Sequence, residues 1–178
     1  MPTIARPAPT DYAPYYGTYI DQVTEADVLA LLARQIDDTV TLLRGVPRAR
    51  WTHRYAAGKW SVSEVVGHMA DTERIFAYRA LRFARNDATP LAGFDENQYV
   101  PPAKFDARPL PELAEELRVV RLASVALFRG FDDAALARRG TANKVEIAVR
   151  AIPWIIAGHE RHHVKVLKER YLVSEPGR

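Results

Sequence analysis

The sequence contains no cysteine, and only five of its 178 residues are histidine. Without cysteine there can be no disulfide bonds, thiolate metal ligands or cysteine nucleophiles. Any metal site must therefore use nitrogen and oxygen ligands from His, Asp and Glu side chains. A spacing pattern among so few histidines is correspondingly informative.

Long apolar runs and basic clusters are also missing. No run approaches the roughly 18 apolar residues that span a bilayer, and residues 1–19 lack the charged start and compact apolar segment of a secretory signal. We therefore expect a cytoplasmic protein that does not bind membranes. The formal net charge is +3, but Lys and Arg are mixed with Asp and Glu and do not alternate with aromatic residues, so nucleic acid is not an expected partner.

What is present fits a single domain. An apolar fraction of 48% and a charged fraction of 26% are ordinary for a globular protein, and this length supports one core. Residues 1–23 hold four prolines and four tyrosines, and we expect them to form an extended lead-in along the surface of the core. We assign a helical metal-binding domain to 24–173 and a short tail to 174–178.

Apolar residues recur at helical spacing in four segments, and no convincing alternation of apolar and polar residues predicts a strand. The first segment begins with Thr24 as N-cap, the second with a capping box from Ser61 to Glu64, and the third with Pro111 in its first turn. The expected helices cover about 24–45, 61–86, 111–130 and 150–171. The fold class is therefore all-α, and we predict a four-helix bundle of up-and-down order.

The connection over 87–109 is longer than most connections in compact domains. We interpret it as functional, and it could change the order of the helices. Within it, Phe94 to Tyr99 could form a lid whose Glu96 or Tyr99 reaches a nearby site, although a packed loop is the slightly favoured alternative. A helical turn over 132–137 and a turn over 140–143 are expected after the third helix.

The fourth expected helix contains His159-Glu160-Arg161-His162-His163. Residues i and i+4 project from one helix face, so His159 and His163 can offer two imidazoles to one metal. Both share their stripe with apolar residues and should point toward the core, where unpaired imidazoles are costly. The pair alone is equally compatible with hydrogen-bonded core histidines. His162 lies off this stripe, at the rim or in a position to support a ligand.

His68 is the third candidate ligand. It lies on a mostly apolar stripe of the second helix, where a structural role is the usual one. Since a bundle brings the second and fourth helices together, one metal held by His68, His159 and His163 accounts for all three. Three neutral imidazoles leave a divalent cation with open positions, as in catalytic sites. Such a site suits zinc or nickel first, with iron or cobalt as alternatives.

Two blocks of the sequence resemble the DinB/YfiT-like superfamily, most closely its YfiT-like branch. The first block is Trp60 to Asp71 followed by Arg79, the second is Gly158 to His163, and the likeness extends over about residues 20–172. The resemblance implies a four-helix bundle that binds a metal through a His of the second helix and an HxxxH pair of the last. Those positions fall on the same three histidines.

The resemblance also implies a function. Family members include transferases that join low-molecular-weight thiols such as bacillithiol to electrophiles, thiol-dependent isomerases, and proteins described only as metal-dependent hydrolases. We therefore expect a metal-dependent enzyme that acts on a small molecule and transfers a bacillithiol-type thiol. The alternatives are a hydrolase that uses a metal-bound water and a non-catalytic metal-binding stress-response module, and a homodimer could form through an exposed helix face.

Further side chains could support the metal or bind substrate. Asp71, one turn after His68, could hold an imidazole or lie exposed. Arg79 could bind a carboxylate through its planar fork or form a salt bridge within the bundle. Glu160 could be a general base, although a surface position is the favoured interpretation. The tyrosines of the lead-in could line the pocket, but exterior aromatic contacts are the favoured interpretation.

Overall fold

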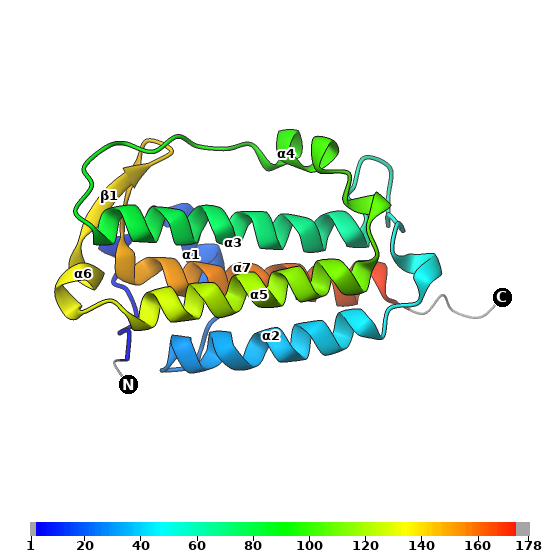
Figure 1. The fold of residues 1–178 in the computed structure, drawn as a ribbon, viewed down its shortest axis with the longest axis horizontal. Coiled ribbons are helices and arrows are strands. Elements are labelled where there is room, and N and C mark those ends of the chain that lie inside the picture. The colour runs from blue at the N-terminus through cyan, green and yellow to red at the C-terminus, as the bar shows by residue number, and fades with distance from the viewer. Residues whose placement is uncertain (1–2, 174–178) are drawn as a thin grey trace.

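Four long helices run side by side in the computed structural model, which describes residues 3–173 (Figure 1). They are α2 (Val28–Arg44), α3 (Val62–Ala84), α5 (Leu110–Arg129) and α7 (Ile152–Val166). The all-α fold class predicted from the sequence is confirmed. The tail expected over 174–178 lies outside the described residues.

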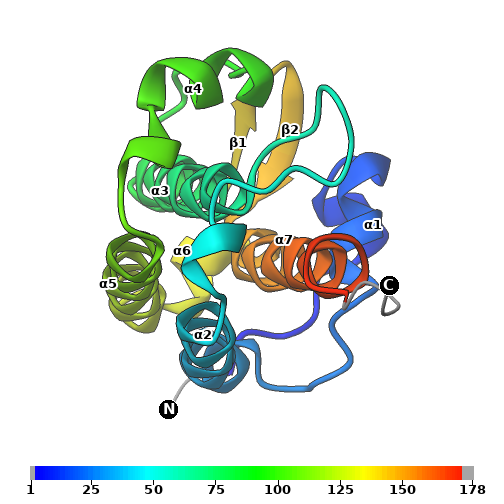
Figure 2. The ribbon, with the colours of Figure 1, turned by 90° about the vertical axis from the view of Figure 1, so that its right-hand side faces the viewer.

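The order of the helices differs from an up-and-down bundle. Both α2 and α3 contact α5 and α7, so α2 and α3 lie at diagonal corners (Figure 2). Helices α2 and α7 run in one direction and α3 and α5 in the other (Figure 1). The prediction of up-and-down order was wrong, because the connection from α3 crosses the length of the bundle before α5 begins.

Local hydrogen bonds explain where the helices begin. Asp27, rather than the expected Thr24, is the N-cap of α2, and its carboxylate accepts from two backbone N–H groups of the first turn. Ser61 and Glu64 form the expected capping box at the start of α3. After α7 the chain continues as one π-helical turn, Leu167–Tyr171.

Smaller helices join the long ones. The lead-in is not extended throughout, because it contains two 3-10 turns and the short helix α1 (Gly17–Ile20), which packs against α7. The connection between α3 and α5, residues 85–109, is called the crossing connection below. It contains α4 (Glu96–Ala103), so this segment is partly helical rather than a plain loop. Helix α6 (Asp133–Ala137) forms the expected helical turn after α5.

A β-hairpin replaces the turn expected over 140–143. Strand β1 (Arg139–Ala142) pairs in antiparallel fashion with β2 (Val145–Ala148). Between them, Asn143 and Lys144 have positive φ angles of 51° and 64°, as the two-residue turn favoured in hairpins requires. The expectation that the chain has no strands was therefore wrong here.

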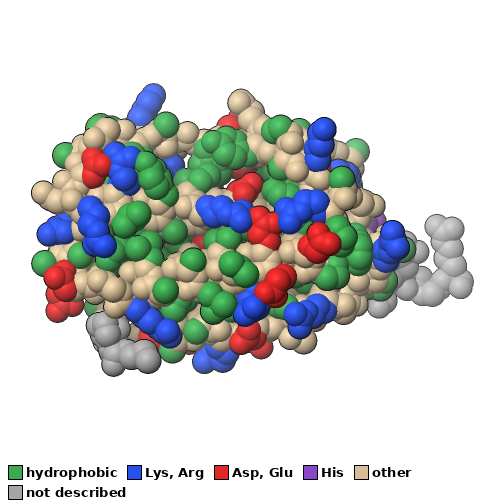
Figure 3. Space-filling model, viewed as in Figure 1, with side chains coloured by type: hydrophobic (Ala, Val, Ile, Leu, Met, Phe, Trp, Pro, Cys, Tyr) green, Lys and Arg blue, Asp and Glu red, His purple; other side chains and the backbone are tan. Residues whose placement is uncertain are grey.

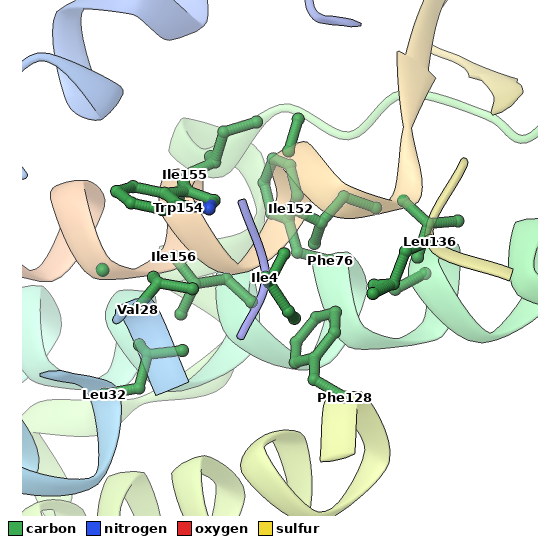
Figure 4. Packing of buried hydrophobic residues seen from close by; sticks show 14 of the residues in the cluster. Ile4, Val28, Leu32, Phe76, Phe128, Leu136, Ile152, Trp154, Ile155 and Ile156 are labelled. Carbon is green, nitrogen blue, oxygen red and sulfur yellow. The ribbon is translucent and has the colours of Figure 1, made fainter. Parts of the chain in front are cut away.

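Two apolar clusters fill the bundle, one toward each end. The cluster near α1 and α6 includes Ile4, Phe76, Phe128 and Trp154 (Figure 4). Between the two clusters, each long helix contributes buried polar residues, which we call the polar layer: Gln35, Thr39, His68, Thr72, Glu73, Arg121, Ser124, His159 and Glu160. Two of the three candidate ligands, His68 and His159, thus belong to a polar section that crosses an otherwise apolar core.

The face formed by α2, α3 and α5 shows Lys and Arg intermixed with Asp and Glu (Figure 3). Several of these charges pair, as Arg74 does with Glu116 and Arg118 with Glu115. This face therefore presents no single-sign patch. Among residues 3–173, no helix combines the length and the apolar character that crossing a bilayer would require.

Candidate metal centre

Three imidazoles converge at the edge of the polar layer, to which His68 and His159 belong and beside which the half-buried His163 lies. The Nε2 atoms of His68 in α3 and His163 in α7 each lie 3.1 Å from Nε2 of His159. All three nitrogens lie within 4.8 Å of one another. The structure therefore brings together the three side chains that the sequence indicated as candidate ligands.

This arrangement fits a shared cation better than hydrogen bonds among the rings. An imidazole nitrogen has either one N–H or one in-plane lone pair, so Nε2 of His159 cannot bond well to two neighbours at once. Two nitrogens bound to one zinc ion at about 2.0–2.1 Å would lie roughly 2.8–3.4 Å apart for ligand angles between about 90° and 110°. The spacing of 3.1 Å falls in this range, so the residues present fit a divalent metal.

Burial keeps the three rings neutral. His68 and His159 are only 7% and 8% exposed. Burial lowers the pKa of His68 to about 4. Burial first, and the neighbouring imidazoles second, lower the pKa of His159 and of His163 well below the usual range. Neutral imidazole is the form that binds metals, so the cluster is ready to accept a cation at neutral pH.

Neighbouring side chains fix the orientation of the rings. The Thr72 hydroxyl lies 3.3 Å from Nδ1 of His68, and the Trp60 ring packs on His68 with centroids 4.7 Å apart. Tyr19 of α1 packs edge-on against His159 with centroids 5.3 Å apart. Contacts of this kind hold metal ligands in place and control the access of solvent.

A glycine precedes a candidate ligand in each of the two helices. A Cβ atom at Gly67 would lie 2.4 Å from the Phe105 ring of the crossing connection. A Cβ atom at Gly158 would lie 2.0 Å from the backbone oxygen of Tyr19. Both positions therefore require glycine, which allows the connection to approach α3, and α1 to approach α7, beside the histidines.

A buried ion-pair triad belongs to the same layer. Arg121 donates to the two carboxylate oxygens of Glu73 at 2.8 and 2.9 Å, and its Nη1 lies 2.6 Å from Glu160. Burial alone would lower the pKa of Arg121, but the carboxylates of Glu160 and Glu73 outweigh this effect and raise it. The triad has two carboxylates and one guanidinium, so its excess negative charge favours a cation nearby.

Glu160 is 2% exposed, so its favoured interpretation as a surface residue was wrong. Its carboxylate accepts from Gln35 at 2.7 Å and from Thr39 at 2.5 Å, in addition to Arg121. These donors occupy the oxygens that a general base would need. Glu160 therefore belongs to the triad rather than to a surface face.

Two larger cavities adjoin the three histidines, in addition to a void of about 10 Å³ beside His159. One, the tyrosine cavity, has a volume of about 140 Å³ and includes among its lining residues His68, His159, Tyr15, Tyr16, Tyr19 and Arg79. The other, the Trp60 cavity, has a volume of about 290 Å³ and includes His163, His162, Trp60, Tyr55 and Lys59. Tyr15, Tyr16 and Tyr19 thus line a cavity, while Tyr15 is 65% exposed and packs edge-on against the other two, so both interpretations of the lead-in tyrosines apply.

The other predicted residues divide between the cavities and the surface. Glu96 lines the tyrosine cavity with Arg79, and His162 lines the Trp60 cavity. Asp71 pairs instead with an arginine of its own helix at 3.2 Å. Tyr99 is 49% exposed and contributes to neither cavity. Two of the supporting residues, Asp71 and Tyr99, are thus not brought to the imidazoles.

Comparisons with known proteins agree with this architecture. A sequence model of the DinB superfamily matches residues 31–167. The chain is similar to the structure of YfiT from Bacillus subtilis, described as a probable metal-dependent hydrolase with an unusual four-helix bundle topology, with a TM-score of 0.72, 17% identity and 84% of each chain covered. It is also similar to a mycothiol-dependent maleylpyruvate isomerase, with a TM-score of 0.58, 19% identity, and 92% of this chain and 62% of that chain covered. No curated protein sequence matches.

Proposed function

Since the chain belongs to the DinB superfamily, we propose that it is a metal-dependent enzyme that transfers a low-molecular-weight thiol of the bacillithiol type to a small electrophile. His68, His159 and His163 would hold one divalent cation, with zinc or nickel as the first candidates. We expect the enzyme to act in the cytoplasm, and we retain a homodimer as a prediction to be measured.

The observation that carries this proposal is the presence of two separate cavities at the three histidines. His68 and His159 line the tyrosine cavity, whereas His163 lines the Trp60 cavity. Two organic molecules can therefore approach the same centre from different places. A thiol transfer needs two such substrates, and the likeness to a mycothiol-dependent isomerase gives further support for a thiol as one of them.

When bound, a divalent cation lowers the pKa of a coordinated thiol, so that thiolate is present at neutral pH. In the transfer, the thiol gives its proton to water, its sulfur forms a bond to the electrophilic carbon, and the leaving group departs with the electron pair of the broken bond. Thr72 orients the His68 ring, and Trp60 and Tyr19 pack against the imidazoles and limit the access of water.

A metal-dependent hydrolase is the second candidate. It is favoured by the likeness to YfiT, which is described as a probable metal-dependent hydrolase. The same three histidines would hold the cation, but only one organic substrate would be needed. The Trp60 cavity would then have no function in the reaction, which is why we place this candidate second.

The test uses the protein reconstituted separately with zinc and with nickel. Each form is incubated with bacillithiol, mycothiol or glutathione and a panel of electrophiles, and conjugates are measured by mass spectrometry. We expect thiol conjugation that is lost in His163→Ala and retained in His53→Ala, because His53 lies before α3, outside both cavities.

The outcomes separate the candidates. Ester or amide cleavage that needs no thiol and is lost in His163→Ala would replace the transferase proposal by the hydrolase. Metal binding without either reaction would support a non-catalytic metal-binding module. Absence of metal binding in the folded protein would contradict all three.

A further inference from the structure

Arg79 is a buried cation without an acidic partner. The residue is 4% exposed. Within the described chain it forms no ion pair with Asp or Glu, and its pKa is lowered by burial and raised only by the neighbouring Tyr16 hydroxyl. Because an uncompensated buried charge is costly, this arrangement needs an explanation.

The second fully buried arginine shows the contrast. Arg121 is 1% exposed and is neutralised by Glu73 and Glu160 within the bundle. The sequence left open whether Arg79 forms a similar salt bridge, and in residues 3–173 it does not. Unlike Arg121, Arg79 therefore still has a positive charge that an acidic ligand could neutralise.

The surroundings of Arg79 hold the guanidinium but leave donors free. Its charge lies over the rings of Phe76 and Phe94, at 5.2 and 5.8 Å from their centroids. Its Nη2 donates to the backbone oxygen of Ala92 at 3.1 Å, and the Tyr16 hydroxyl lies beside it. A guanidinium has five N–H donors, so several remain for a ligand in the tyrosine cavity.

The segment that brings Phe94 to Arg79 is held by the β-hairpin. The Leu91 N–H donates to the backbone oxygen of Thr141 at 2.9 Å, and the Asn143 N–H donates to the backbone oxygen of Leu91 at 3.1 Å. These bonds extend the edge of β1 into the crossing connection. The wall of the cavity around Arg79 is thus fixed by backbone hydrogen bonds.

Arg79 and His68 lie on the same stripe of α3, and both line the tyrosine cavity. Their Cα atoms are separated by roughly 16 Å along the helix axis. Side chains on a helix lean toward its N-terminus, so the guanidinium is directed back along α3 toward His68. A small molecule in this cavity can therefore contact the guanidinium and approach the histidines at once.

We propose that Arg79 binds the carboxylate of the electrophilic substrate, whose apolar body lies along the walls formed by Phe76 and Ile155 and whose reactive end faces the histidines. This assignment rests on the proposed function. A planar guanidinium matches a carboxylate with two parallel hydrogen bonds. Glu96, the acidic residue that also lines the cavity, is exposed and makes no ion pair with Arg79, so it does not take this place.

The experiment measures the binding of simple carboxylates by calorimetry. Phenylacetate and phenylpropionate are compared with the corresponding neutral amides, on the zinc-loaded protein and on the metal-free protein. In the metal-free protein a carboxylate cannot bind through the cation. We expect each carboxylate to bind at least about tenfold more tightly than its amide, which is the size of a charge-assisted hydrogen-bond effect.

Three variants complete the test. Arg79→Gln should abolish the preference for the carboxylate, while Arg82→Gln should keep it, because Arg82 pairs with Asp87 outside the cavity. Tyr16→Phe should weaken carboxylate binding several-fold without removing the guanidinium. If Arg79→Gln does not fold, the carboxylate–amide comparison in the unchanged protein and in Tyr16→Phe decides the question.

The outcome of the binding experiment can be judged independently of whether the proposed thiol transfer takes place. A carboxylate preference that depends on Arg79 in metal-free protein supports the inference even if no thiol transfer is found. Equal binding of acid and amide, or a preference that survives in folded Arg79→Gln, overturns the inference even if thiol transfer to neutral electrophiles is observed.

Discussion

The three imidazoles differ from the other polar side chains of the bundle because their Nε2 atoms face one another. Nε2 of His159 lies at 3.1 Å from two other ring nitrogens, whereas Nδ1 of His68 has the Thr72 hydroxyl beside it. A cluster of this kind is stabilised by a shared cation. Without the cation, burial first and the neighbouring imidazoles second keep the cluster neutral.

The first prediction concerns the pH dependence of the metal-free protein. An exposed imidazole in the unfolded chain takes up a proton near pH 6.5, whereas folded His68 does so only near pH 4, and His159 and His163 resist protonation further. The unfolded state therefore binds more protons in this window. The free energy of unfolding should be at its full value above pH 6.5 and should fall as the pH decreases toward 4.

Each additional proton contributes a slope of about 1.4 kcal/mol per pH unit. Urea unfolding with a chelator present, measured between pH 7 and pH 4, gives the slope directly. His68→Asn should reduce it by the share of one imidazole. An unfolding free energy that does not change over this range would show that the folded cluster binds protons readily, contrary to its burial.

At the residue level, the histidine pattern could be predicted and Glu160 could not. His159 and His163 are four residues apart on one face, and His68 shares an apolar stripe, so helix periodicity directs all three inward and a shared metal accounts for them together. Glu160 lies a quarter turn away and was assigned to a surface face. Helix α7 has no such face near its start, because every residue of Ile152–Glu160 is buried, and this depends on neighbours that periodicity does not reveal.

At the level of elements, close approach of α1 to α7 depends on Gly158. The backbone oxygen of Tyr19 occupies the place of a side chain at this position. The same residue, Tyr19, packs against His159 and lines the tyrosine cavity. The position of a short N-terminal helix therefore determines one wall of the candidate site.

We predict that Gly158→Ala displaces α1 and lowers the free energy of unfolding by about 1–3 kcal/mol, the usual cost of overfilling a core. Chemical denaturation measures this loss, and the fluorescence of the tyrosines reports the displacement. The matched control is Gly130→Ala, where the added Cβ has no heavy atom nearer than 3.4 Å and φ is −85°. A stability equal to that of the control would contradict the role given to Gly158.

The polar layer links all four long helices through Arg121. Replacing it by methionine leaves the carboxylates of Glu73 and Glu160 buried without their common partner. We predict a loss of about 3–5 kcal/mol of unfolding free energy, as for other broken buried ion pairs. Arg118→Met is the control on the same helix, since Arg118 and its partner Glu115 are only half-buried and pairs near the surface contribute about 0–1 kcal/mol. Similar losses of unfolding free energy in both variants would contradict the prediction.

Elements with strong local signals were predictable, and the hairpin was not. The capping box and the apolar stripe place α3 within two residues of its observed end. The strands have four residues each and join through Asn143 and Lys144 rather than through an Asn-Gly pair. Their pairing depends on the positive φ angles of the turn and on contact with the crossing connection. Strands of four residues carry no sequence signal for either feature.

At the level of the whole molecule, the order of the helices depends on the crossing connection. Its length was evident from the sequence, but length alone permits either a return along the same edge or a passage across the bundle. The passage is fixed by contacts distant in sequence: Phe105 against Gly67, and Leu91 against β1. The four helices could be predicted, whereas their arrangement required these tertiary contacts.

The final prediction follows from the way the centre joins α3 to α7. A cation held by His68, His159 and His163 binds the folded chain and not the unfolded one, so it stabilises the whole molecule by mass action. At a free concentration of one hundred times Kd the gain is about 2.7 kcal/mol, which for a domain of this size corresponds to a rise in Tm of roughly 5–10 °C. Calorimetric melting of metal-free protein with added zinc or nickel measures it. His68→Ala should remove the rise and His53→Ala should preserve it, because only the first variant deletes a nitrogen of the cluster; a rise that persists in His68→Ala would place the cation elsewhere.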